Sequence, residues 1–316
     1  MKPQFVLISS LILSFCPPIA PAQWVQTIDS TTVISFATTV THIYAGTYEE
    51  PTRLFGFTVF SSTTAGSSWM NVGSPVGGTN VAGLVINEGN IFAGTNGQWF
   101  WGIYRSTNNG TSWKATWTDR QVLSLGVKGG RLFAGLCCGD VALSTDNGTS
   151  WTPAHLGETG ATVVAFVVKD TALFAATDGS GVFLSTNDGM SWTAANDGLA
   201  NTRVLSLGVA DENLFAGTFG GGVFISTNNG TSWTAVNNGL THLSVYAIVA
   251  RDTGLFAGTG GGGVFLSTNN GANWASANEG LTGMNVMTLT VHDNFVFAGT
   301  LSQGVWRRPL SDFVSV

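Results

Sequence analysis

Two short segments near the N-terminus hold the side chains best suited to contacting a ligand. The ligand-binding candidates in these segments are Tyr48, Glu49, Glu50, Arg53, Trp99 and Trp101. An indole ring offers a flat apolar face on which a sugar can stack, while carboxylate and guanidinium groups form directional hydrogen bonds. These residues therefore predict a binding surface for a carbohydrate or a peptide. The alternative interpretation is that Trp99, Phe100 and Trp101 fold inward as a small satellite core.

Acid–base cleavage of a glycoside would need two carboxyl groups about 5–9.5 Å apart across the sugar. The acids available for such a pair are Glu49, Glu50, Asp140 and Asp178, and each also fits as an ordinary turn residue. We therefore assign no catalytic residue. The histidines His42, His155, His242 and His292 follow no spacing typical of metal ligands, so we expect neither a metal site nor a cofactor.

An aromatic residue recurs along the chain at a nearly constant interval. After a first gap of 48 residues, five gaps of 41 residues separate the series Tyr44, Phe92, Phe133, Phe174, Phe215, Phe256 and Phe297. The segments between them alternate short apolar runs with glycine and asparagine turns, as antiparallel strands joined by tight hairpins do. Seven such units predict an all-β fold, a seven-bladed β-propeller with four antiparallel strands in each blade.

The two ends of the chain complement each other within this repeat. In the fifth unit the strands are predicted at 204–207, 213–216, 223–226 and from 233 onward. The seventh unit stops after its third strand, and residues 24–28 resemble the missing fourth. We therefore expect the N-terminal strand to close the last blade, because ring closure removes two open sheet edges.

The position of each connection in the repeat predicts which face carries function. In a four-stranded blade, the turn between the second and third strands shares one face with the loop to the next blade. Blades 1 and 2 carry insertions in that turn, within 48–56 and 96–101, and long loops on a rigid scaffold are frequent binding sites. The loops between blades hold Arg120, Arg203, His242 and Asn285, which predict either a ring around the channel mouth that takes a small anion or solvated turn residues.

The first 22 residues are typical of a secretory signal peptide. Lys2 precedes an apolar run from Phe5 to Phe15, and small residues lead to a cleavage point near Ala22. A run of 11 apolar residues is too short to span a bilayer. We therefore expect cleavage to release the propeller, 23–316, as a secreted, periplasmic or cell-surface protein with no membrane span.

Composition narrows the classes of partner. The chain has 9% charged residues, 42 glycines and a net charge of −6, which excludes the basic stripe of a nucleic-acid-binding protein. Beyond the predicted leader the only cysteines are the neighbours Cys137 and Cys138. Adjacent Cα atoms lie about 3.8 Å apart, below the usual disulfide range of about 4.4–6.8 Å, so the pair is either a strained vicinal disulfide or two free thiols.

The turns before the fourth strands share a motif. They read STNNGTSW (106–113 and 226–233), STDNGTSW (144–151), STNDGMSW (185–192) and STNNGANW (267–274), with a degenerate STTAGSSW at 62–69. These turns resemble the Asp-box, or bacterial neuraminidase repeat, of pattern Ser-x-Asp-x-Gly-x-x-Trp. Only Asp146 keeps the aspartate, since Asn108, Asn187, Asn228, Asn269 and Thr64 replace it.

The resemblance implies a propeller but not one activity. The family includes sialidases, xyloglucan-cleaving glycosidases, sortilin-type receptors and photosystem II assembly-factor-like proteins. Its sialidases are six-bladed and use three arginines with a tyrosine nucleophile, a set that this chain does not match. We expect an exported, monomeric, non-catalytic binding module for an extracellular glycan or protein. The alternatives are a glycoside hydrolase acting on extracellular polysaccharide and a scaffold or assembly factor for other proteins.

Overall fold

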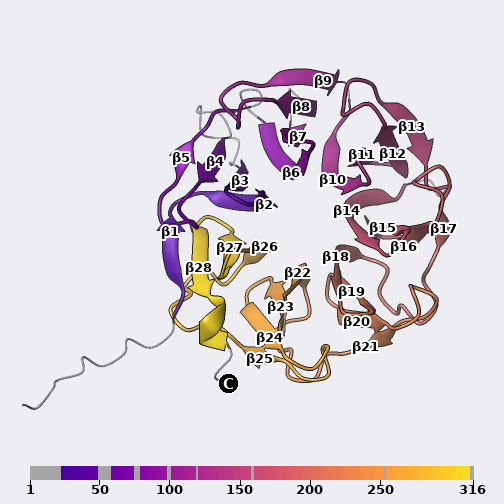
Figure 1. Ribbon diagram of the computed structural model, residues 1–316. Coiled ribbons are helices and arrows are strands. Elements are labelled where there is room, and N and C mark those ends of the chain that lie inside the picture. The colour runs from indigo at the N-terminus through magenta and orange to yellow at the C-terminus, as the bar shows by residue number, and fades with distance from the viewer. Residues whose placement is uncertain are drawn as a thin grey trace, which may run out of the picture.

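The computed structural model describes residues 23–48, 58–74, 79–97, 101–118, 120–157, 160–251 and 254–313. They form seven four-stranded antiparallel sheets around a central opening, with the first strand of each sheet innermost (Figure 1). The sheets are the seven blades of a β-propeller, so the predicted fold is confirmed. Within the described ranges no helix is long and apolar enough to cross a membrane.

The strands follow one another blade by blade. Blade 1 contains β2 (Thr32–Thr38), β3 (Ile43–Tyr48), β4 (Val59–Ser62) and β5 (Met70–Asn71). Blade 2 contains β6 (Thr79–Asn87), β7 (Asn90–Gly97), β8 (Gly102–Ser106) and β9 (Lys114–Thr118). Blade 3 contains β10 (Val122–Lys128), β11 (Arg131–Leu136), β12 (Asp140–Ser144) and β13 (Thr152–His155). Blade 4 contains β14 (Thr162–Lys169), β15 (Ala172–Asp178), β16 (Gly181–Ser185) and β17 (Thr193–Ala194).

The last three blades complete the ring. Blade 5 contains β18 (Val204–Ala210), β19 (Asn213–Thr218), β20 (Gly222–Ser226) and β21 (Thr234–Ala235). Blade 6 contains β22 (Val245–Arg251), β23 (Gly254–Thr259), β24 (Gly263–Ser267) and β25 (Ala275–Ser276). Blade 7 contains β26 (Val286–His292), β27 (Phe295–Thr300), β28 (Gly304–Pro309) and β1 (Val25–Ile28), and a short 3-10 helix, η1 (Leu310–Phe313), follows.

The hydrophobic core lies between the blades. The second strand of each blade is covered on both faces, so every residue from Leu214 to Thr218 in β19 is buried. Phe215 of this strand packs against Val245 and Trp274 of blade 6. The indole of Trp274 also donates a hydrogen bond of 2.8 Å to the carbonyl of Val236 in blade 5. Neighbouring blades are therefore joined by shared apolar side chains and by the tryptophan that ends each turn motif.

The turn motif is held by its own side chains. In the turn before β21, the Ser226 hydroxyl accepts the Gly230 N–H at 2.9 Å and donates to the Asn228 side-chain oxygen at 2.9 Å. The same Asn228 oxygen accepts the Ser232 N–H at 2.9 Å. Asn229 adopts a positive φ of 55°, a conformation that asparagine tolerates better than most residues. This network makes the motif a structural clasp.

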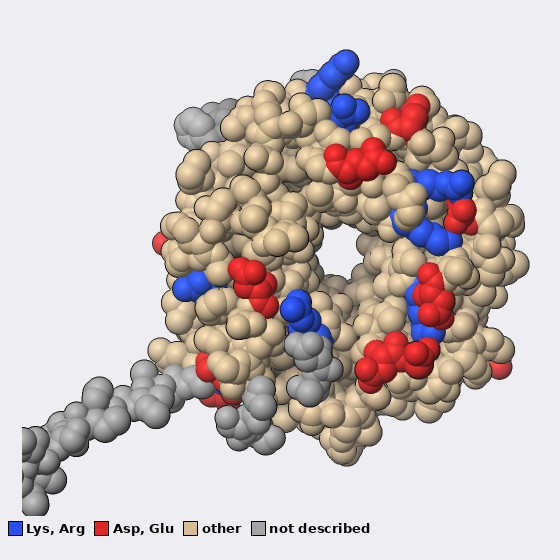
Figure 2. Space-filling view, in the orientation of Figure 1, with Lys and Arg blue, Asp and Glu red and all other residues tan. Residues whose placement is uncertain are grey.

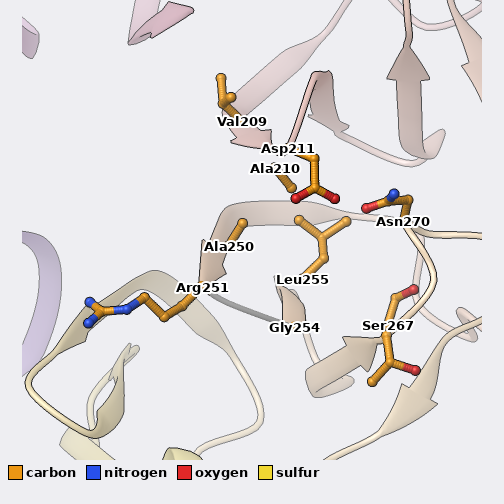
Figure 3. Close-up of a pocket in the computed structure, with 10 residues that line it drawn as sticks. Val209, Ala210, Asp211, Ala250, Arg251, Gly254, Leu255, Ser267 and Asn270 are labelled. Carbon is orange, nitrogen blue, oxygen red and sulfur yellow. The ribbon is translucent and has the colours of Figure 1, made fainter.

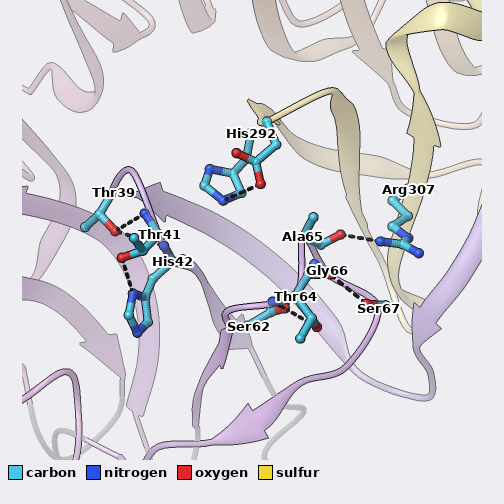
Figure 4. Close-up of polar contacts among 11 residues, drawn as sticks. Thr39, Thr41, His42, Ser62, Thr64, Ala65, Gly66, Ser67, His292 and Arg307 are labelled. Carbon is cyan, nitrogen blue, oxygen red and sulfur yellow. Dashed lines mark hydrogen bonds and ion pairs between the residues drawn. The ribbon is translucent and has the colours of Figure 1, made fainter.

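The degenerate copy in blade 1 keeps the same fastening at the junction with blade 7 (Figure 4). The Ser62 hydroxyl accepts the N–H groups of Gly66 at 3.0 Å and Thr64 at 3.2 Å. Arg307 of β28 reaches across and donates to the carbonyl of Ala65. The Thr64 hydroxyl accepts the Ser68 N–H at 3.0 Å, so threonine takes over the hydrogen bond that the motif's aspartate would make.

The N-terminal strand closes the ring, as predicted. β1 pairs antiparallel with β28 at the outer edge of blade 7 (Figure 1). Trp24, just before β1, is only 2% exposed and donates its indole N–H to the carbonyl of Ala277 at 2.6 Å. The junction therefore uses the same bond to the preceding blade that Trp233 and Trp274 make in blades 5 and 6.

Candidate functional site

One face of the ring carries the turns between second and third strands together with the loops between blades; we call it the insertion face. Single β-bridges join three of these loops to the preceding blade's turn, at Asp178 with Arg203, Phe219 with Ser244, and Gly260 with Asn285. The backbone at these positions is therefore fixed. Of the ligand-binding candidates, Glu49, Glu50, Arg53 and Trp99 lie outside the described residues. Tyr48, at the end of β3, and Trp101, just before β8, are both half-buried on this face.

Arg203 forms the most ordered polar contact of the insertion face. Its guanidinium donates to both carboxylate oxygens of Asp178, from Nε at 2.7 Å and from Nη2 at 3.3 Å. The same group lies 4.2 Å from the centre of the Phe219 ring, within the range of a cation–π contact. The hydrogen bond to Asp178 raises the pKa of Arg203, so the side chain stays charged. This arrangement holds the phenyl ring in place at the surface.

Arg120 is paired in a similar way in blade 3. Its Nη1 lies 3.1 Å from one carboxylate oxygen of Asp140, whose other oxygen lies 2.6 Å from Nδ1 of His155. His242, in the loop before blade 6, contacts the hydroxyl of Thr241 at 3.1 Å. The arginines that the sequence nominated for an anion site thus each have a carboxylate partner. The two nominated acids, Asp140 and Asp178, are those partners.

The insertion face also exposes apolar side chains that sequence reasoning missed. Phe219 and Leu243 are each 40% exposed and Leu301 is 41% exposed. The N–H of Gly220 donates to the carbonyl of Leu243 at 3.0 Å, so the turn that carries Phe219 lies against the loop that carries Leu243, at the junction of blades 5 and 6. The sequence does contain a signal for this site. Phe219 is apolar at the turn position where blade 4 has Asp178 and blade 6 has Gly260.

The channel through the ring is apolar. A cavity of about 390 Å³ is lined by the residue that follows the buried valine in each first strand. These residues are Ile34, Ala82, Leu123, Val164, Leu205, Tyr246 and Met287. Tyr246, Ser206 and Thr288 bring hydroxyl groups to a lining that is otherwise apolar.

The opposite end of the ring is more polar. A groove of about 410 Å³ between blades 5 and 6 is lined by Asp211, Asn270 and Leu255 among others (Figure 3). Acidic and basic side chains alternate around the central opening in the view of Figure 2. At the junction of blades 3 and 4, Lys128 and Arg131 both pair with Asp188. These charges join neighbouring blades. Among the described residues, no group of three or more His, Cys, Asp or Glu side chains could hold a metal ion.

Comparison with known proteins supports the fold. The profile of the DUF6242 beta propeller domain matches residues 157–292. No curated protein matches the chain in sequence. Solved structures that resemble it include YCF48 bound to a D1 peptide, at 13% identity and a TM-score of 0.70, covering 93% of this chain and 98% of that one. YCF48 from Cyanidioschyzon merolae resembles it at 13% identity and 0.69, covering 91% and 98%.

Two enzymes resemble the chain over part of their length. An ancestral GH74 enzyme matches at 17% identity and a TM-score of 0.70, with 91% of this chain and 46% of that chain covered. The GH74 xyloglucanase from Xanthomonas campestris matches at 14% identity and 0.68, with 94% and 55% covered. The chain thus spans about half the length of these enzymes. At such identities the likeness is one of fold, which in the named proteins occurs both in a structure bound to a peptide and in part of a xyloglucanase.

Proposed function

We propose that this protein is an exported, non-catalytic binding module that holds an extended segment of a protein partner on the insertion face. The observation that carries the proposal is the exposed pair Phe219 and Leu243, with Phe219 fixed beneath the guanidinium of Arg203. Aromatic side chains held rigidly at a surface lose little entropy on binding and dominate many interfaces. Leu301 and the half-buried Tyr48 place further apolar groups on the same face, in blades 7 and 1.

Two further points support a protein ligand. The similar YCF48 structure was solved with a D1 peptide, and the likeness of fold covers 98% of that chain. The resemblance of the turns to the Asp-box repeat fits a fold that serves receptors and assembly factors. The predicted leader, 1–22, would bring the propeller to partners outside the cytoplasm.

The test is a peptide array probed with the purified protein. We expect a subset of peptides rich in aromatic or aliphatic residues to bind. Phe219→Ala should weaken that binding about tenfold or more, because removing a rigid aromatic anchor costs about 2 kcal/mol. Met190→Ala is the matched control, since Met190 is 76% exposed but lies in a turn at the opposite end of the ring.

Other outcomes would replace the proposal. Equal losses in Phe219→Ala and Met190→Ala would show that the array reports non-specific adhesion. An absence of peptide binding together with glycan binding that Trp101→Ala abolishes would move the site to blades 1 and 2 and make the ligand a carbohydrate.

The second candidate function is a glycoside hydrolase, favoured by the likeness to GH74 propellers. The paired state of Asp140 and Asp178 disfavours it, because a carboxylate held by arginine is poorly placed to give up or take a proton. A panel of polysaccharides decides the question. Hydrolysis that Asp140→Asn or Asp178→Asn abolishes would establish an enzyme.

A further inference from the structure

Cys137 and Cys138 form a compact pair in the turn between β11 and β12. They are the only cysteines of 23–316. Both carry free thiols, Cys137 half-buried and Cys138 exposed. The pKa of the Cys137 thiol is raised, first by a hydrogen bond with the Cys138 thiol and second by burial. The two thiols therefore belong to adjacent residues of one turn, and the Cys138 side chain faces solvent.

Gly139, the residue that follows the pair, is anchored through both of its backbone groups. The N–H of Gly139 donates to the carbonyl of Ala161, and the carbonyl of Gly139 accepts the Leu156 N–H at 3.0 Å. Cys138 adopts a positive φ of 66°, which turns the chain sharply between the two thiols. Gly139 is thus held between the residues that follow β13 and precede β14, which fixes the C-terminal side of the turn. The thiols stay within reach of each other because they belong to adjacent residues.

We propose that Cys137 and Cys138 are a thiol-modification site, a vicinal dithiol that a small disulfide oxidant closes reversibly and a trivalent arsenical chelates. In the first step the exposed Cys138 thiolate attacks the oxidant disulfide, forming a mixed disulfide and releasing one thiolate. Cys137 then loses its proton and attacks Cys138 Sγ, releasing the second thiol. One oxidant disulfide is reduced to two thiols and one protein disulfide forms.

The bond is reversible because the residues are neighbours. Their Cα atoms lie about 3.8 Å apart, against about 4.4–6.8 Å in ordinary disulfides, so ring closure is strained and the bond is easily reduced. Strained, exposed disulfides are the labile ones in proteins. In the reduced state the same two sulfur atoms suit one trivalent arsenic, which bonds to both as its oxygen leaves as water.

The experiment equilibrates the folded protein with oxidised and reduced glutathione, quenches it with acid and measures its mass. We expect the oxidised wild type to lose two hydrogen atoms, located by peptide mapping to the peptide that holds both cysteines. Both thiols should become inert to an alkylating reagent and return after treatment with reduced glutathione. Phenylarsine oxide should bind the reduced protein one to one and fail to bind the oxidised protein.

Single variants make the result specific. Cys137→Ser should stop at a glutathione adduct on Cys138, and Cys138→Ser should form its adduct more slowly because Cys137 is half-buried. Neither should retain the arsenical, while thermal unfolding confirms that both are folded. A wild type that accumulates glutathione on both cysteines, or that links only between molecules, would overturn the proposal. So would arsenical binding that survives in either single variant.

Discussion

At the scale of single residues, the turn motif explains why asparagine can replace its aspartate. In the blade 3 copy, one oxygen of Asp146 accepts the Ser150 N–H at 2.9 Å and the Ser144 hydroxyl at 2.8 Å. The oxygen of Asn228 does the same in blade 5. The second oxygen of Asp146 accepts the Ser150 hydroxyl, where Asn228 instead donates to Ser232. Aspartate and asparagine therefore both form hydrogen bonds to the two serines of the turn, with the same geometry.

Asp146 should make the free energy of unfolding depend on pH in the acidic range. Its hydrogen bonds, chiefly from Ser150, lower its pKa from 3.8 to about 2. Because the folded pKa is depressed, its stabilising effect is present above the unfolded pKa and is lost as pH falls towards about 2. Urea unfolding between pH 5 and 2 should show a shallower loss of stability in Asp146→Asn than in the wild type. The reciprocal Asn228→Asp should steepen it, and the same slope in all three proteins would contradict this account.

At the scale of strands, close packing between blades depends on one glycine position. Gly217 of β19 pairs with Ser206 of β18, and an added Cβ would lie 2.4 Å from the Ser206 hydroxyl and 2.7 Å from a methyl group of Val245. Blade 4 has Ala176 at the same position, where the paired residue is Ala165. The missing hydroxyl in blade 4 gives room for the extra methyl group.

This relationship predicts a compensated pair of substitutions. Gly217→Ala should destabilise the fold by about 1–3 kcal/mol, because overpacking forces neighbouring strands apart. Adding Ser206→Ala should recover part of the loss by removing the hydroxyl, whose oxygen has no hydrogen-bond partner in the structure, while the contact with Val245 remains. Chemical denaturation measures both. A double variant no more stable than Gly217→Ala would show that the blade 5–6 contact alone limits the site.

At the scale of the whole molecule, the ring is held closed at blade 7. Trp24 binds back to blade 6, and Arg308 of β28 donates to the carboxylate of Glu279 at 2.5 Å. The Arg308 guanidinium also lies 4.5 Å from the centre of the Phe313 ring in η1. Both ends of the described chain are thus fastened to the same junction, which is where a ring made of repeats would otherwise open.

Deleting residues 23–28 should open the ring and expose the edge of β28. We expect lower stability and self-association, since a free strand edge pairs readily with another chain. Light scattering after size exclusion reports the association. Trp24→Ala keeps the strand but should cost about 3–5 kcal/mol, as for other buried tryptophans. Val25→Ala is the control, because Val25 is 50% exposed and should change stability little. A deleted protein that stays monomeric and equally stable would disprove the closure.

Much of the fold could be predicted from sequence because a propeller repeats local hairpins. The interval of 41 residues, the valine before each aromatic and the glycine and asparagine turns act within one blade. They determined the blade number, the strand order and the strand that closes the ring. In blade 5 the fourth strand, Thr234–Ala235, begins one residue later than predicted, because Trp233 packs into the core shared with blade 4.

The candidate site depended on contacts that the repeat does not encode. Whether Arg203 reaches Asp178, whether Arg120 reaches Asp140, and whether Phe219 stands at the surface are set by how a loop lies across the preceding blade. Such contacts join residues about 20 or more positions apart through side chains that vary from blade to blade. The sequence by itself determined the scaffold and the face on which binding is expected. Only the tertiary structure decided which charges are paired and which apolar groups stay exposed, because burial and ion pairing belong to the packed surface.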